Sequence, residues 1–120
     1  MRTQNIIQHK TYEFAVRVVK LHLDICKNTR QYEISRQFLR AGTSIGANTE
    51  EAIGAESKKD FVHKLSIAYK EARETKYWLR ILKDTGLIGS NITESMLNEC
   101  EEILAIIAKI KITTLNNMKT

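Results

Sequence analysis

The chain has 120 residues, of which 42% are hydrophobic and 28% charged, and it contains no proline. This length fits a single domain, and the absence of proline favours long helices, because proline removes a helical hydrogen bond. The net charge of +5 mildly favours acidic partners such as nucleic acid or an anionic surface.

Two amphipathic helices are expected in the first half of the chain. The first covers about residues 5–27, and its apolar positions follow helical spacing: Ile7, Phe14, Val18, Leu21 and Ile25. The second covers about residues 30–55, after a break at Asn28-Thr29. Its stripe alternates steps of four and three through Ile34, Phe38, Ala41, Ile45, Asn48 and Ala52.

The second half of the chain predicts two more helices. The third, over 57–84, begins at Ser57, whose side chain can accept from backbone amides, and ends at Gly86 in a left-handed conformation. Its apolar face is Phe61, Leu65, Ala68, Ala72, Thr75, Leu79 and Leu82. The fourth, over 93–117, opens at Thr93. Its apolar face is Met96, Cys100, Ile103, Ile107 and Ile110, widened by Leu97, Leu104, Ile106 and Leu115.

Short links between long helices force neighbours antiparallel, so an all-α, up-down-up-down four-helix bundle is predicted, with residues 1–120 in one domain. Cys26 and Cys100 fall on or beside apolar stripes and are interpreted as buried free thiols; a disulfide would need their helices side by side. No apolar run approaches the roughly 20 residues that span a bilayer. The N-terminus lacks the apolar core of a signal peptide, so a cytoplasmic protein is expected.

Glycines interrupt the helical pattern of residues 41–55, and each costs about 1 kcal/mol relative to alanine in a helix interior. Gly42 and Gly46 are four residues apart and therefore lie on one face. We expect them to form a close contact with the third helix, which offers its own small residues, Ala68, Ala72 and Thr75. The alternative is that they only weaken and bend the second helix. Gly54 is expected to terminate it.

Asn48 is a polar residue in the apolar register of the second helix. A buried amide without a hydrogen bond costs about 1–3 kcal/mol, so it requires partners. The candidates are Glu71 and Glu74 of the third helix, or backbone carbonyl groups. A polar contact that fixes the helix register is the favoured interpretation over a catalytic one.

The segment 37–51, QFLRAGTSIGANTEE, resembles a family signature that runs roughly Q-x-x-R-A-x-x-S-I-x-A-N-I-A-E-G. That signature belongs to the four-helix-bundle proteins encoded in bacterial 23S rRNA intervening sequences. The resemblance covers nearly the whole chain and continues to segment 71–79, EARETKYWL. The chain departs from the signature at Thr49, Glu50 and Ala52.

The resemblance implies a compact bundle that assembles as a homo-pentamer around a central channel, and no enzymatic activity is attached to the family. A related bundle is an accessory factor of diversity-generating retroelements, where it binds nucleic acid and a reverse transcriptase through a basic surface. We therefore predict a homo-oligomer that binds RNA or DNA without sequence specificity. The alternative is a structural or adaptor oligomer that binds another protein.

The basic residues are concentrated in the first and third helices. Residues 1–30 hold six basic and two acidic side chains, and residues 56–90 hold eight and five. The candidate nucleic-acid-binding residues form a stripe on the third helix, near Tyr77: Arg73, Lys76, Arg80 and Lys83. Weaker candidates on the first helix are Lys10, Arg17 and Lys20. The alternative is an ordinary solvated surface, in which Asp84 pairs with Arg80.

Five further polar residues are assigned to a buried network that fixes packing or the contact between protomers: Arg40, Asn48, Glu51, Glu71 and Glu74. The chain has no Glu-x-x-His pair of the di-iron bundles, no phosphate-binding loop and no zinc motif. His9, His22 and His63 lack the spacing of metal ligands. We therefore expect no catalytic residue, no metal and no cofactor.

Overall fold

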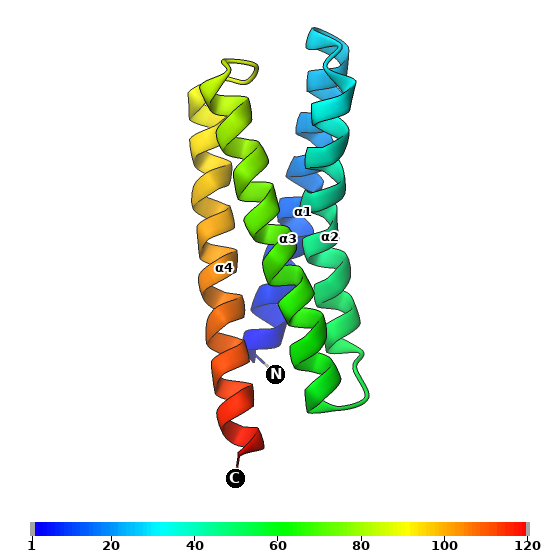
Figure 1. Cartoon of the computed structure of the whole chain (residues 1–120), viewed down its shortest axis with the longest axis vertical. Helices are drawn as coiled ribbons and strands as arrows, with labels where there is room; N and C mark the ends of the chain where they lie inside the picture. The colour runs from blue at the N-terminus through cyan, green and yellow to red at the C-terminus, as the bar shows by residue number, and fades with distance from the viewer. Residues whose placement is uncertain (1, 120) are drawn as a thin grey trace.

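Four helices form the part of the chain that the computed structural model describes, residues 2–119, with side chains placed from residue 4. They are α1 (Arg2–Thr29), α2 (Tyr32–Ile53), α3 (Lys58–Asp84) and α4 (Ser90–Met118). Consecutive helices run antiparallel in a rod of 52 × 21 × 20 Å (Figure 1). Helices α1 and α3 each contact α2 and α4, so α1 and α3 are diagonal. The predicted up-down-up-down bundle is confirmed. None of the described helices is both long and apolar enough to cross a membrane.

The helix ends follow the expected capping chemistry at α3 but not at α4. The hydroxyl of Ser57 accepts from the backbone N–H of Asp60 at 3.0 Å, and Gly86 has φ of 73°, as predicted. Helix α4 begins at Ser90, three residues before the predicted start. The prediction failed there because Thr93 is not a cap: its hydroxyl donates to the Gly89 and Ser90 carbonyl oxygens inside the first turn.

Helix α2 is shorter than predicted, by two residues at each end. It ends at Ile53, and Gly54 caps it, as the position of that glycine indicates. At its other end the turn from α1 holds Arg30 in the left-handed conformation, with φ of 60°. A residue other than glycine in this conformation gives no sequence signal, so the boundary at Tyr32 was missed.

The core lies along the bundle axis and is built from the predicted apolar stripes. Every predicted position of α1 is buried, as are Phe38, Ala41, Ile45 and Ala52 of α2. Leu115 of α4 is an exception, because it is 41% exposed near the end of the bundle.

Asn48 of α2 is only half-buried. The neighbouring Thr49 occupies the buried position that the apolar stripe predicted for Asn48. Thr49 satisfies its hydroxyl within the helix, donating to the Ile45 carbonyl oxygen at 2.8 Å. Buried Thr11 and Thr75 do the same with the carbonyl oxygens four residues earlier. The core therefore holds threonines without leaving their hydroxyls unpaired.

The two glycines of α2 face α1, so the predicted contact with α3 is wrong. A Cβ at Gly42 would lie 2.7 Å from both methyl carbons of Val18, and one at Gly46 would lie 3.2 Å from the carbonyl oxygen of Thr11. The lack of a side chain at these glycines therefore allows α1 and α2 to pack closely together. Beside them, His22 Nδ1 and the buried Ser35 hydroxyl lie 2.8 Å apart across the same pair of helices.

Both cysteines are free thiols. Cys100 is buried, and its Sγ donates to the Ala72 carbonyl oxygen at 3.1 Å, so α4 closely approaches the α3 backbone there. Burial raises the pKa of the Cys100 thiol to about 12. Cys26 is only half-buried. Within residues 2–119, no three or more His, Cys, Asp or Glu side chains form a group that could hold a metal ion.

Candidate nucleic-acid interface

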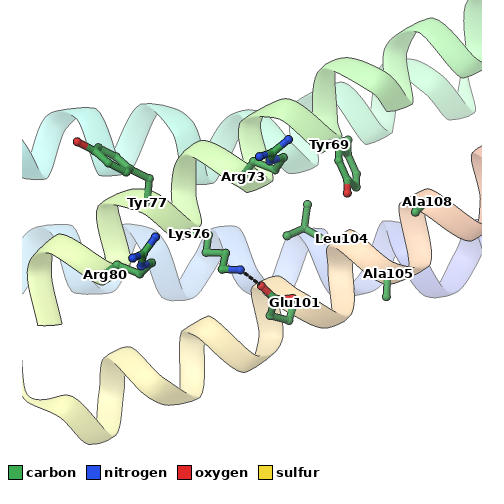
Figure 2. Close-up of a pocket in the computed structure, with 9 residues that line it drawn as sticks. All are labelled: Tyr69, Arg73, Lys76, Tyr77, Arg80, Glu101, Leu104, Ala105 and Ala108. Carbon is green, nitrogen blue, oxygen red and sulfur yellow. Dashed lines mark ion pairs between the residues drawn. The ribbon is translucent and has the colours of Figure 1, made fainter. Parts of the chain in front are cut away.

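Three of the four residues of the basic stripe, Arg73, Lys76 and Arg80, line a groove between α3 and α4. The groove has a volume of about 490 Å³. Because α3 buries Leu65, Ala72 and Leu79 in the core, the positions on one flank of this buried face lie along the edge shared with α4. The residues that line the groove are Tyr69, Arg73, Lys76, Tyr77 and Arg80 of α3, with Glu101, Leu104, Ala105 and Ala108 of α4 (Figure 2).

The four basic residues of the α3 stripe differ in their partners. Lys76 forms an ion pair with Glu101, and Lys83 pairs with Glu94 at 3.0 Å. Arg73 and Arg80 are exposed and have no ion pair or hydrogen bond within the described part of the chain. The expected alternative partner of Arg80, Asp84, therefore does not hold it. The groove presents two uncompensated guanidinium groups.

Aromatic rings accompany these guanidinium groups. Tyr77 is 54% exposed, and its ring contacts Trp78 edge to face, with centroids 5.2 Å apart. Tyr69 lies under the Lys111 ammonium, 5.5 Å from the ring centroid, in a cation–π contact. Sequence reasoning missed Tyr69 and Lys111 as part of this site. The spacing of Tyr69, four residues before Arg73, was the available signal.

The weaker candidates of the first helix mostly serve the contact between α1 and α4. Lys10 pairs with Glu102 at 3.0 Å. Arg17 pairs with Glu99 and donates to the Ser95 hydroxyl at 3.2 Å. Lys20 is exposed and lies outside the α3–α4 groove. The sequence analysis did not predict these ion pairs with glutamates of α4. The spacing of residues within the first helix carries no information about which residues of the fourth helix lie opposite them.

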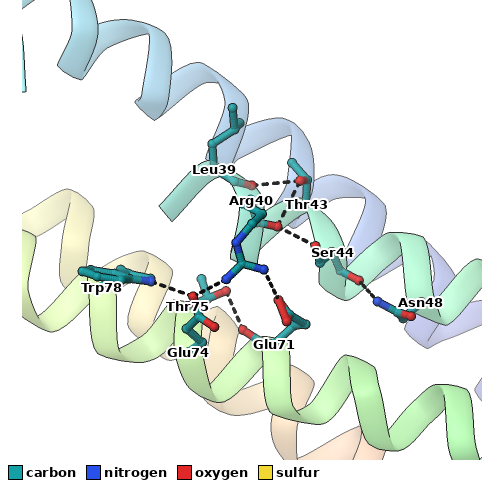
Figure 3. Close-up of polar contacts among 9 residues, drawn as sticks. All are labelled: Leu39, Arg40, Thr43, Ser44, Asn48, Glu71, Glu74, Thr75 and Trp78. Carbon is teal, nitrogen blue, oxygen red and sulfur yellow. Dashed lines mark hydrogen bonds and ion pairs between the residues drawn. The ribbon is translucent and has the colours of Figure 1, made fainter. Parts of the chain in front are cut away.

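A second polar cluster joins α2 to α3 (Figure 3). Arg40 binds Glu71 at 3.3 Å and Glu74 at 2.5 Å, and the indole N–H of Trp78 donates to Glu74 at 3.0 Å. These carboxylates raise the pKa of Arg40, with the hydrogen bond to Glu74 as the largest cause. The cluster fixes α2 and α3 in register and holds Trp78 in place.

The structure corrects two features of the predicted buried network. Asn48 donates to the Ser44 carbonyl oxygen of its own helix at 2.8 Å, and Glu51 is exposed, so neither joins the cluster. The cluster is also not buried, because the side chain of Arg40 is 52% exposed. A half-exposed position suits these charges, since burying a charged group is costly.

Replacing Glu74 with glutamine is expected to flatten the pH dependence of stability below about pH 5. In the folded protein the pKa of Glu74 is lowered from 4.5, first by the Trp78 hydrogen bond and also by Arg40. The ionised carboxylate therefore stabilises the fold above about pH 4.5, and this contribution is lost as the pH falls through the lower folded-state pKa. Thermal unfolding followed by circular dichroism measures the effect. Glu51→Gln is the matched control, and equal slopes for the two variants would contradict the prediction.

The comparisons with known proteins agree with this fold. A crystal structure at 1.70 Å resolution, of a protein with unknown function from the S23 ribosomal protein family of Bacteroides thetaiotaomicron VPI-5482, is 44% identical. The two structures superpose with a TM-score of 0.86, over 88% of this chain and 97% of that one. No curated protein matches the chain.

A family model, described as 23S rRNA-intervening sequence protein, matches residues 3–109. This range includes α2 and α3, which carry the polar cluster and the α3 stripe, together with nearly all of α1 and most of α4. The match therefore covers both sides of the α3–α4 groove. The chain belongs to the 23S rRNA-intervening sequence protein family.

Proposed function

We propose that this protein is a non-enzymatic bundle that binds RNA or DNA without sequence specificity through the α3–α4 groove. The observation that supports this most is the pair Arg73 and Arg80, two exposed guanidinium groups on one edge of the groove that have no partner among the described residues. Guanidinium groups bind phosphate with two parallel hydrogen bonds, and phosphate contacts give affinity without reading sequence. Lys76 and Lys83 can also bind phosphate, once each gives up its ion pair with a glutamate of α4.

The proposal includes a homo-oligomer, a pentamer as the family resemblance implies, in the cytoplasm. Each copy would carry one groove, so linked copies would bind a long strand with an avidity above that of one site. A relation to the accessory bundles of diversity-generating retroelements belongs to the same proposal. Light scattering tests the assembly: a mass near five times the 13.8 kDa of one chain is expected, and a monomer at micromolar concentration would contradict it.

The double variant Arg73→Gln/Arg80→Gln is expected to bind a mixed-sequence oligonucleotide roughly tenfold more weakly. Two lost phosphate contacts should also lower the slope of log K against log salt by about 1 to 2, because fewer counterions are released. Fluorescence anisotropy at several salt concentrations measures both quantities.

The matched control removes the same charge elsewhere on α3. Lys58→Gln/Lys59→Gln changes two exposed residues at the start of the helix, about 20 Å along its axis from Arg73. It should weaken binding less and leave the groove contacts in place. Equal losses in the two double variants would mean that net charge, and not the groove, governs binding.

The second candidate function is an adaptor that binds another protein. It is favoured by exposed apolar residues near the end of α4, Ile112, Leu115 and Met118. Such residues are typical of contact surfaces between proteins. An oligomer that binds neither RNA nor DNA at any salt concentration would favour the adaptor function over nucleic-acid binding through the groove.

A further inference from the structure

We infer that the α3–α4 groove takes single-stranded nucleic acid, with an unpaired base stacked on Tyr77 and the flanking phosphates on Arg73 and Arg80. This inference rests on the proposed function and narrows it from nucleic acid in general to an unpaired strand. Tyr77 lies between the two arginines in the sequence, and all three line the same groove (Figure 2). The two arginines are about 10 Å apart along the helix axis.

Tyr77 is arranged as a platform for a flat ring. It is 54% exposed, so a face of its ring is accessible, yet the edge-to-face contact with Trp78 restrains it. Trp78 in turn packs against the core and donates to Glu74, which Arg40 holds. A ring that is already ordered loses little conformational freedom when a base stacks on it.

Short side chains keep the α4 side of the groove open. Leu104, Ala105 and Ala108 line it at the end next to Tyr69, away from Tyr77, so a strand stacked on Tyr77 can continue along the groove (Figure 2). Tyr69, at this far end, is already covered by Lys111. Tyr69 therefore supports a third cation near the groove, and Tyr77 is the ring available for stacking.

The aromatic ring distinguishes a single strand from a duplex. In a duplex the bases are paired and stacked on one another, so a side chain outside it meets mainly phosphate and sugar. Stacking on an aromatic side chain is available only to unpaired bases, and it tolerates any sequence because every base has a flat face. The basic residues alone would bind both forms.

The experiment compares Tyr77→Ala with Tyr77→Phe, which keeps the ring. The probes are single-stranded oligouridylate and oligothymidylate of about 12 nucleotides, and RNA and DNA duplexes of the same length. We expect Tyr77→Ala to bind the single strands roughly 5- to 100-fold more weakly, with duplex binding unchanged. Tyr77→Phe should bind like the unmodified protein. Equal losses on RNA and DNA would support base stacking, whereas a loss on RNA only would contradict it, because a DNA base offers the same flat face.

The control variant is Tyr12→Ala, which removes a tyrosine that is 66% exposed on α1 outside the groove. A direct readout comes from Trp78, the single tryptophan of the chain, whose ring contacts Tyr77. Its fluorescence should change with the single strands and not with the duplexes. Circular dichroism verifies that each variant is folded.

The outcomes separate the inference from the proposed function. Single strands bound equally by the unmodified protein and Tyr77→Ala would overturn the inference and leave the basic groove intact. A loss of duplex binding in Tyr77→Ala would overturn it as well. No binding of any probe by the unmodified protein at low salt would instead overturn the proposed function itself.

Discussion

Gly42→Leu is expected to lower the free energy of unfolding by about 3 kcal/mol, at the upper end of the cost of overpacking. A Cβ at this position would lie 2.7 Å from both methyl carbons of Val18, which is fully buried. Val18 cannot turn aside easily, because its branched side chain has one strongly preferred rotamer in a helix. Helices α1 and α2 would have to move apart. Urea unfolding at a fixed protein concentration measures the loss.

Two further variants test whether the clash is the cause. Gly54→Leu places the same side chain at an exposed glycine with only ordinary contacts, so stability should change by no more than about 0.5 kcal/mol. Val18→Ala removes the two methyl groups in the way. The loss of unfolding free energy in the double variant Val18→Ala/Gly42→Leu should therefore be smaller than the sum of the losses in the two single variants, by about 1 kcal/mol or more. Additive effects would show that Val18 is not the obstacle.

The apolar periodicity predicts which positions face the bundle axis but not which neighbour they meet. Helix α2 has two neighbours, and one residue step turns its direction by about 100°. Arg40, one position before the buried Ala41, contacts α3, whereas Gly42, one position after it, faces α1. The sequence predicted small residues in close contact but assigned the wrong partner helix. The choice depends on how the helices are rotated in the bundle, which no local pattern encodes.

For the α3 stripe too, the sequence predicts one part of the arrangement and only the structure reveals the other. The spacing of Arg73, Lys76 and Arg80 indicates correctly that they share a side of α3. It does not reveal that Glu101, on another helix, neutralises Lys76, while the two arginines have no ion pair with any residue that the structure describes. The groove itself depends on the short side chains of Ala105 and Ala108 meeting this edge. Such pairing across helices follows from their relative shift along the bundle axis, so it appears only in three dimensions.

Arg17→Met is expected to lower the free energy of unfolding by about 1–2 kcal/mol, because Arg17 serves the contact between α1 and α4. Its partner Glu99 has a buried carboxylate oxygen, Oε1, which has no hydrogen-bond partner in the described part of the chain besides this ion pair. Methionine keeps the packing of the side-chain stem and removes every donor. The carboxylate would then stay desolvated without a cation. The cost stays below that of a fully buried pair, since the two side chains are 38% and 32% exposed.

Removing the carboxylate as well should restore stability, because two apolar side chains can replace a partly buried ion pair at little cost. Arg17→Met/Glu99→Met is therefore expected to unfold within about 0.5 kcal/mol of the unmodified protein, and Lys20→Met, an exposed residue of the same helix, serves as the control. RNA affinity separates the two roles of Arg17. If Arg17 contacts phosphate, both the single and the double variant will bind more weakly. If it only joins α1 to α4, the stable double variant will bind as well as the unmodified protein, and Arg17 is not part of the nucleic-acid surface.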